Sequence, residues 1–543
     1  MTRAARWTLL SRAALGLLLA WLVVFPILMV ARAAADPTAV TEFAHRATEW
    51  RALWASIWIA VASVVLSAAI GIPLAFLFEW LEFPGRKTLG ALVALPAVLP
   101  PFVGVISFLF LYGESGFVSR AVQGLFGLSQ PPWRLQGAGA ILLVHAYSMY
   151  VYFYLFTRAG LAKLDASMLE AAQVLGAGRR EVLTRVVLPL IRPSLGGAAL
   201  LVFMTALGSF SAPYVFGGGF RVMTTQIVTS KLNGEMGLAM VETVALAAVA
   251  LLGVALLRRT ERDDILVALG KGTAPRPRPI RRPLVRTLAT AAGWVFAVVL
   301  LLPHLTLVLV SLVPYGTWTT ETLPPVISLV NYHRLAAEPE RLAPLLNSAW
   351  MAAASTAGAV VLALAAGHLV GRGRAGRWRG VIEGLIALPW ALPGTVFAVA
   401  LALTFSAWQP PVRFVLVGTV VILPLAYLVR SLPITGRALL AGFRQLDPAL
   451  DEAAASLGAG RWATFRRVTL PLVRPALMAG ASLAFVGALG DFVASIVLYT
   501  YDNRPISIEI MSSLRLSEIG IAAAFGVILM VASAAVLAVG ARR

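Results

Sequence analysis

The sequence from residue 164 to 195 reads LDASMLEAAQVLGAGRREVLTRVVLPLIRPSL. The same pattern returns 282 residues later, where residues 446–477 read LDPALDEAAASLGAGRWATFRRVTLPLVRPAL. About 18 of these 32 aligned positions are identical without a gap, although the flanking sequence aligns only loosely. Loops usually diverge more than the elements that they connect. The repeat therefore indicates two similar halves, each carrying the same constrained segment.

The repeated segment is typical of two short helices joined by a sharp turn. Asp165 and Asp447 are N-cap candidates for the first helix. The first helix is predicted to end at Gly176 or Gly458, because glycine readily adopts the left-handed conformation of a C-cap. The second helix is expected over 179–185 or 461–467. It enters an apolar run past two prolines four residues apart, at positions 189 and 193 or 471 and 475.

Composition indicates a membrane protein. Of 543 residues, 59% are hydrophobic and 13% are charged, and the mean hydropathy is +0.84. A soluble domain of ordinary composition is about 25% charged, so this chain has too few charges for a solvated shell. It contains no cysteine, which excludes disulfides, thiolate metal sites and a cysteine nucleophile.

Twelve apolar runs are long enough to cross a bilayer, and we expect an all-α integral membrane protein with about 12 transmembrane helices. The runs lie at about 13–34, 51–79, 88–112, 137–158, 193–216, 237–257, 287–313, 347–370, 380–406, 412–430, 475–498 and 519–541. They form two tandem six-helix halves related by pseudo-two-fold symmetry. Residues 1–257 and 287–543 are the predicted domains, and 258–286 form a Pro/Arg linker that joins the halves without packing against them.

The basic residues fall on one side of this arrangement. Most Arg and Lys lie in the even-numbered connections, so the positive-inside rule places both termini in the cytoplasm. The net charge of +20 then reflects topology and attraction to anionic lipid, and no nucleic-acid partner is expected. The first apolar run is long enough to be a retained helix instead of a cleaved signal.

The repeated segment resembles the coupling loop of binding-protein-dependent ATP-binding cassette importer permeases of type I. The resemblance rests on Glu-Ala-Ala, a glycine after three residues and Leu-Pro thirteen residues beyond that glycine, present twice. It implies that each loop docks a short helix into a cleft of one ATPase subunit. The coupling positions are then Glu170, Ala171, Ala172, Gly176 and Arg179, with Glu452, Ala453, Ala454, Gly458 and Arg461. The alternative is that these residues only shape a turn into the bilayer.

The ATPase must be a separate chain. No phosphate-binding loop of the G-x-x-x-x-G-K-[ST] type occurs, and Gly270-Lys271-Gly272-Thr273 lacks the upstream glycine. Two docking loops imply two ATPase subunits, which would bind ATP and Mg. No cofactor or metal is expected in this chain itself, and a membrane-bound enzyme is disfavoured because the five histidines are scattered.

Several residues are candidates for the translocation path. Asp491 aligns with Ser209 at the repeat offset, and an acid within an otherwise nearly charge-free span is by default functional. Paired prolines should bend the third and ninth spans and expose carbonyl groups; they are Pro96, Pro100, Pro389 and Pro393. The alternatives are a structural role for Asp491, a purely shaping role for the prolines, and for His145 a hydrogen bond between helices.

The whole chain resembles the fused permeases for iron(III) and thiamine. Residues 212–227 and the Ala-Leu-Gly-Asp-Phe ending at residue 492 are similar to the iron branch, which makes ferric iron the best guess. Thiamine, phosphonate or another small solute stays open. The resemblance implies a bacterial inner-membrane location and a periplasmic or lipid-anchored binding protein. An ion-coupled secondary transporter is the alternative of another class, but it gives no reason for the duplicated cytoplasmic loops.

Overall fold

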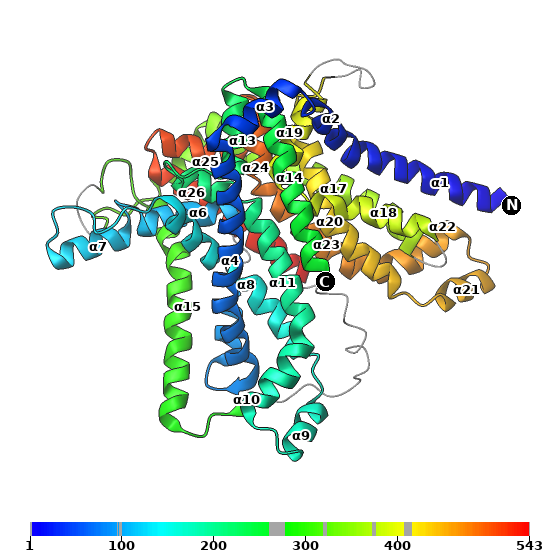
Figure 1. The fold of residues 1–543 in the computed structure, drawn as a ribbon, viewed down its shortest axis with the longest axis horizontal. Helices are drawn as coiled ribbons and strands as arrows, with labels where there is room; N and C mark the ends of the chain where they lie inside the picture. The colour runs from blue at the N-terminus through cyan, green and yellow to red at the C-terminus, as the bar shows by residue number, and fades with distance from the viewer. Residues whose placement is uncertain are drawn as a thin grey trace.

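The computed structural model describes residues 3–94, 96, 100–259, 277–318, 323–371, 376–406 and 415–541. Over these residues the secondary structure is helical, apart from one parallel pairing of β1 (Leu81–Glu82) with β2 (Arg278–Pro279). This confirms the predicted all-α class. A helix provides a hydrogen-bond partner for every interior backbone N–H and C=O group within the same segment, which is required in a bilayer that offers no water. Figure 1 shows the spans spread into two arms, one ending at α9 and the other at α21.

Six helical spans make up the first half in the predicted order. They are α1 (Arg3–Leu19) with η1 (Ala20–Val24) and α2 (Phe25–Ala33); α4 (Ala47–Trp80); α5 (Arg86–Leu92) with α6 (Pro101–Tyr112); α8 (Gly137–Leu161); α10 (Arg179–Glu181) with η3 (Val182–Val187) and α11 (Leu188–Leu207); and α14 (Met236–Arg259). Shorter helices connect them: α3 (Pro37–His45), α7 (Phe117–Phe126), α9 (Ala166–Val174), α12 (Ser211–Phe216) and α13 (Met223–Leu232).

The second half repeats this order. Its spans are α15 (Pro283–Ser311); α17 (Pro339–Ala366) with η5 (Gly367–Gly371); α18 (Arg377–Ala387) with η6 (Leu388–Trp390) and α19 (Gly394–Thr404); α20 (Ile422–Arg444); α22 (Arg461–Thr464) with η7 (Phe465–Thr469) and α23 (Leu470–Leu489); and α26 (Ile519–Ala541). The connecting helices are α16 (Val330–Ala337), α21 (Ala449–Ser456), α24 (Val493–Leu498) and α25 (Ile506–Arg515).

Three predicted spans need correction. The tenth was placed at 412–430, but α20 runs from Ile422 to Arg444 and carries Arg430 and Arg437 within it. Hydropathy misses this helix because the two cations lower its mean hydropathy. The structure tolerates them through local contacts, since the Arg437 guanidinium lies 4.9 Å from the centre of the Trp390 ring. The fifth and eleventh spans end at Leu207 and Leu489, where the chain breaks before α12 and α24.

The first span of each half packs against the other half. Helix α1 contacts α18, and α2 contacts α19, whereas α15 contacts α5 and α6. The predicted halves are thus interlocked through exchanged helices. The end of the linker is also fixed, because Leu81 pairs with Arg278 and Ile280 packs on the first-half core. The prediction that the linker packs on nothing is wrong for residues 278–280, and its Gly270–Thr273 motif lies outside the described residues.

Small residues let the spans approach closely. The buried face of α4 carries Ala60, Ser63, Ser67 and Gly71 at helical spacing and packs on α8. A Cβ at Gly71 would lie 2.4 Å from the Tyr150 carbonyl oxygen, so only glycine fits there. In a bilayer such close backbone packing replaces the hydrophobic drive between helices.

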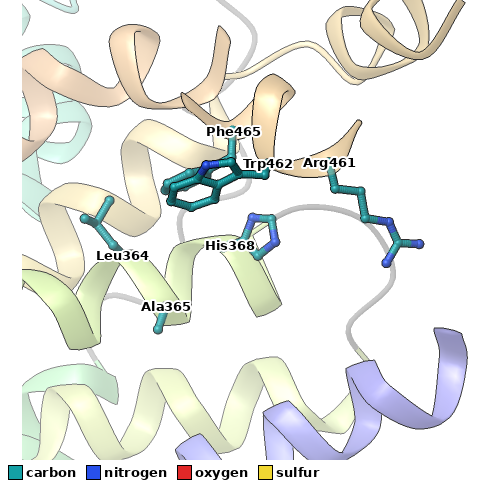
Figure 2. A pocket seen from close by; sticks show the side chains of 6 residues that line it. All are labelled: Leu364, Ala365, His368, Arg461, Trp462 and Phe465. Atoms are coloured by element: carbon teal, nitrogen blue, oxygen red, sulfur yellow. The ribbon is translucent and has the colours of Figure 1, made fainter. Parts of the chain in front are cut away.

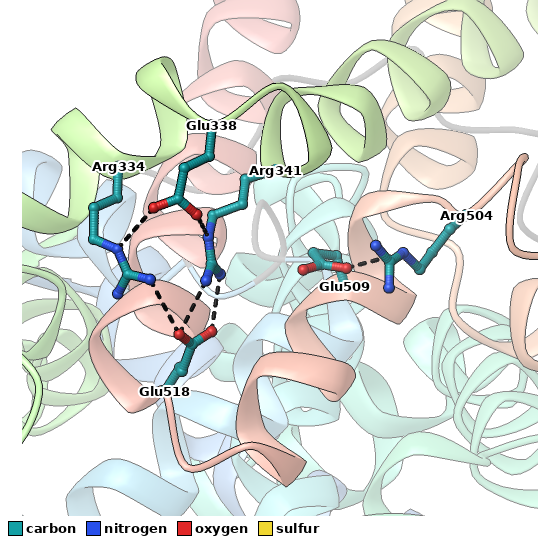
Figure 3. A network of polar contacts seen from close by, with 6 residues as sticks. All are labelled: Arg334, Glu338, Arg341, Arg504, Glu509 and Glu518. Atoms are coloured by element: carbon teal, nitrogen blue, oxygen red, sulfur yellow. Dashed lines mark hydrogen bonds and ion pairs between the residues drawn. The ribbon is translucent and has the colours of Figure 1, made fainter.

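Ion pairs tie the last span of each half to the short helix that precedes its second span. In the first half, Arg46 after α3 binds Glu42 and Glu235. In the second half, Arg334 and Arg341 bind both Glu338 and Glu518 (Figure 3). These clusters lie at the molecular end opposite α9 and α21, where α3 and α25 stand in Figure 1.

Candidate coupling and translocation sites

Both repeated loops fold into the same exposed, capped helix. The carboxylate of Asp165 accepts a hydrogen bond of 3.0 Å from the Ser167 amide, which confirms it as the N-cap of α9. Asp447 accepts a bond of 2.9 Å from the Ala449 amide, although Pro448 is the residue next to α21. Each helix therefore has a carboxylate acceptor at its start, as predicted from the sequence.

The glycines end both helices in the same way. Gly176 has φ +87° and Gly458 has φ +77°, in the left-handed region. The amides of Ala177 and Ala459 reach back to the carbonyls of Ala172 and Ala454, at 3.0 and 2.9 Å. This is the Schellman geometry, and it confirms the predicted C-caps.

The coupling candidates lie on the free surface of this motif. Glu170, Glu452, Arg179 and Arg461 are exposed, as are Ala171 and Ala453, while Ala172 is half-buried and Ala454 is buried against the turn. Among the described residues, none bonds to the carboxylate of either glutamate. The structure thus presents two unpaired carboxylates on rigid, capped helices at the ends of the two arms (Figure 1).

Sequence reasoning missed two apolar members of this surface. Leu175 is 87% exposed and Leu457 is 89% exposed, at matched positions beside the C-cap glycines. Met168 and Leu450, also matched, are partly exposed on the same helices. An invariant leucine in both copies of the repeat was a signal for them. Leucines so exposed in both copies are typical of a surface that a partner covers.

The two loops differ just beyond the shared turn. In the first half Glu181 accepts a bond of 3.2 Å from the Gly178 amide and pairs with Arg185 at 3.4 Å. In the second half Trp462 stacks on Phe465, with ring centres 5.7 Å apart. These rings line an apolar pocket with His368 and Leu364 of the neighbouring span, and Arg461 lines its edge with its guanidinium extended away from the rings (Figure 2).

The predicted proline kinks occur where the third and ninth spans break. The helices on either side of the break after Trp390 are bent by 102°, and Pro389 and Pro393 flank this break. Pro96 and Pro100 lie between α5 and α6. All four prolines are buried, so the breaks face the protein interior instead of lipid.

The path candidates meet across the two halves. A Cβ at Gly490 would lie 2.6 Å from Cβ of Pro100, and a Cβ at Gly208 would lie 3.4 Å from Cα of Pro393. The break before α24 thereby touches the third span, and the break before α12 touches the ninth. Ser209 and Asp491 sit next to these crossing points, near the boundary between the halves.

Aromatic rings fill the space beside these crossings. Phe102 and Phe492 stack with ring centres 3.9 Å apart and planes 8° apart. Phe210 lies 5.8 Å from Phe492, and Tyr214 lies 5.1 Å from Phe210 and 5.8 Å from Phe492. The three phenylalanines are buried. The cluster thus joins Phe102 and Phe210 of the first half to Phe492 of the second.

Hydrogen bonds hold both candidate polar residues. The Ser209 hydroxyl lies 2.9 Å from Nε2 of His145, whose Nδ1 lies 2.8 Å from the Ser63 hydroxyl. Asp491 pairs with Arg430 and accepts a bond of 2.8 Å from the Ala494 amide. Charge within the spans is therefore not confined to Asp491. Arg430 lies within α20, and the acid is neutralised instead of being free for a cation.

Buried carboxylates also occur in the first half, where Glu49 of α4 and Glu242 of α14 are inaccessible. The Gln226 amide donates to Glu49 at 3.1 Å and the Ser230 hydroxyl donates to Glu242 at 2.7 Å. Within the described residues there is no group of three or more His, Asp or Glu side chains that could hold a metal ion. These acids therefore anchor α13 between two spans.

Comparison with known proteins settles the family. The model of the binding-protein-dependent transport system inner membrane component matches residues 69–263 and 359–542, once in each half. The chain belongs to this family. It is therefore an inner-membrane permease of a binding-protein-dependent ABC transporter, with two copies of the family domain in one polypeptide.

Relatives of the permease have several named solutes. A probable ABC transporter permease, y4fN of Sinorhizobium fredii, is 33% identical over 87% of this chain and 83% of its own length. The ferric transport permease FbpB of Actinobacillus pleuropneumoniae is 28% identical over 82% of this chain and 64% of its own. The thiamine permease ThiP of Brucella abortus is 33% identical over 33% of each chain.

Proposed function

We propose that this permease carries a small solute, with ferric iron as the best guess, from an external binding protein to the cytoplasm. Two separate ATPase subunits, which bind ATP and Mg, dock on α9 and α21 and drive the cycle. The observation that carries this proposal is the pair of matched helices at the ends of the arms. Each has a carboxylate acceptor at its start, a left-handed glycine at its end, an exposed leucine and a glutamate that has no partner among the described residues.

The geometry suggests how docking would move the spans. Each coupling helix is followed after a short turn by a helix that continues through a π-helical segment, Val182–Val187 or Phe465–Thr469, into α11 or α23. These long helices end at the breaks that touch the prolines of the opposite half. A displacement of α9 or α21 would thus be transmitted along one element to the crossing beside the aromatic rings. Alternating access follows if the crossings separate.

Ferric iron is favoured by relatives that align along most of the chain. The ferric permease of A. pleuropneumoniae covers 82% of this chain, whereas the thiamine permease covers 33%. The molybdenum permease ModB of Escherichia coli is 32% identical over 40% of this chain, which matches a single half. Thiamine, phosphonate and other small solutes stay as alternatives.

The orientation with both termini in the cytoplasm belongs to the same proposal.

Reversing both coupling charges tests the function. Glu170→Lys combined with Glu452→Lys should abolish ATP-dependent uptake and co-purification of the ATPase, because both docking surfaces lose their carboxylate. The protein should still insert, since neither side chain has a partner among the residues that the structure describes. Glu340→Lys, an exposed glutamate at the opposite end, is the matched control and should transport normally. Normal ATPase co-purification with the double variant would refute the coupling assignment.

A further inference from the structure

A pocket of about 430 Å³ opens between α24, α25 and the loop that joins them. These elements lie at the end of the molecule opposite the coupling helices (Figure 1). The polar side chains that line it belong to Tyr499, Thr500, Tyr501, Arg504, Ser512 and Arg515. The volume is that of a site for a small molecule.

The lining is positively charged. Two arginines and four hydroxyl-bearing residues line the pocket, and no acidic residue does. Arg504 pairs with the buried Glu509 at 3.0 Å (Figure 3). Arg515 donates to the Tyr214 hydroxyl and has no carboxylate partner among the described residues. One cation therefore stays uncompensated beside donors suited to an oxyanion.

The fold itself does not require Arg515. Past the break before α12 and α24 the repeat offset becomes 283 residues, because α13 begins at Met223 and α25 begins at Ile506. Arg504 then corresponds to Arg221, whereas Arg515 corresponds to the uncharged Leu232. The second arginine is thus specific to the second half, which points to a ligand instead of to packing.

The pocket is connected to the aromatic cluster. Tyr214, the acceptor of the Arg515 hydrogen bond, contacts both Phe210 and Phe492. Ile496 lines the pocket and lies on the helix that begins next to Phe492. An anion that binds Arg515 would compete with the Tyr214 hydroxyl for this guanidinium and so act directly on a ring that contacts the aromatic cluster.

From this geometry we infer that the pocket is an entry site for an oxyanion, a solute that presents carboxylate or phosphate-like oxygens. The inference rests on the proposed import function and narrows its substrate class. Arg504 and Arg515 would repel a bare trivalent cation. Ferric iron would therefore pass this site as an anionic complex whose ligands carry the negative charge.

Direct binding to the purified full chain tests the site. Citrate and inorganic phosphate would be titrated at constant ionic strength, with binding followed by calorimetry and by thermal shift. Saturable binding of at least one of these anions is expected, and Arg515→Gln should weaken it at least tenfold. Arg221→Gln, an exposed arginine in the corresponding first-half loop, is the matched control and should leave the affinity unchanged.

Two results would overturn the site. One is the absence of saturable binding of either anion to the wild-type chain, and the other is unchanged affinity in Arg515→Gln. If Arg515→Gln instead weakens only complex formation with the binding protein, the pocket is a docking contact and the inference fails. Anion binding should persist in the Glu170→Lys, Glu452→Lys variant, because that surface lies at the other end. Failure of the coupling proposal is thereby distinguishable from failure of this one.

Discussion

Two glycines set the shape of the coupling helices. Gly176 and Gly458 hold left-handed backbone at the C-caps, and nothing lies within 4 Å of a Cβ built on either. Backbone conformation, not crowding, therefore explains the glycines. The direction in which Leu175 and Leu457 project depends on this turn.

Alanine at these glycines should uncouple transport. Gly176→Ala with Gly458→Ala should destabilise each cap by about 1–2 kcal/mol, the usual cost of left-handed backbone for other residues. We expect a several-fold lower ATP-dependent uptake in vesicles with little change in thermal unfolding. Gly178→Ala with Gly460→Ala is the control, because both residues have φ near −67° or −68°. Equal losses in the two double variants would contradict the role of the turn.

Arg430 and Asp491 should behave as an energetically coupled pair. Replacing either one alone leaves a partly buried charge without its partner, so Asp491→Leu and Arg430→Leu should each lower the free energy of unfolding. The loss in the double variant should be smaller than the sum of the two single losses. The double variant should recover a coupling energy of about 1 kcal/mol or more. Thermal unfolding of the purified chain measures this cycle. Strict additivity would show that the ion pair contributes nothing.

The two residues of this ion pair differ in how readily the sequence reveals them. Asp491 stands out because it is an acid in an apolar run. Arg430 was missed because the apolar window at 412–430 made it a loop residue. The repeat offset gave the better signal, since α8 shifted by 282 residues covers 419–443, close to the observed α20. Its ion pair connects spans ten and eleven, and no local pattern reports such a contact.

At the scale of elements, ion clusters fix the ends of the spans opposite the coupling helices. Hydrogen bonds from Arg341 lower the pKa of Glu338 and of Glu518 below the usual glutamate value. Arg46 does the same to the pKa of Glu235. A carboxylate with a depressed pKa stabilises the folded state above its unfolded pKa, and this contribution is lost as pH falls through the folded pKa.

Acid should therefore loosen this end of the permease. Thermal stability should be constant from neutral pH down to about pH 5 and should then fall as Glu518 and Glu338 begin to protonate below about pH 4.5. Glu518→Gln should lower stability at pH 7 and flatten this acid limb, because the group that titrates is gone. Unfolding temperatures of both proteins between pH 3.5 and 7 measure the effect. An acid limb of equal steepness in the variant would contradict it.

Sequence periodicity predicted most elements but not their partners. Length and hydropathy located eleven of the twelve spans, and capping residues located α9 and α21. The exchange of α1–α2 and α15 between halves was not predictable, because it depends on contacts between segments hundreds of residues apart. The aromatic cluster was missed for the same reason, since Phe102, Phe210 and Phe492 come from three separate elements.

At the scale of the whole molecule, the pseudo-symmetry is incomplete in useful ways. The coupling surfaces match closely, as expected if both receive the same kind of partner. The opposite end differs, because Arg515 corresponds to the uncharged Leu232 in the first half. Coupling would thus be nearly symmetric, whereas solute entry would be one-sided. A fused chain can evolve in this way because each half is always paired with the other.

Site-directed cross-linking tests the central claim, that α9 and α21 each dock one ATPase subunit. The chain contains no cysteine, so Leu175→Cys and Leu457→Cys each supply a unique thiol. With a thiol-to-amine cross-linker, each variant should capture one ATPase subunit in the assembled transporter. Leu516→Cys, at a leucine that is 67% exposed at the opposite end, should capture none. Absence of ATPase cross-links from both coupling positions, or equal capture at position 516, would contradict the account.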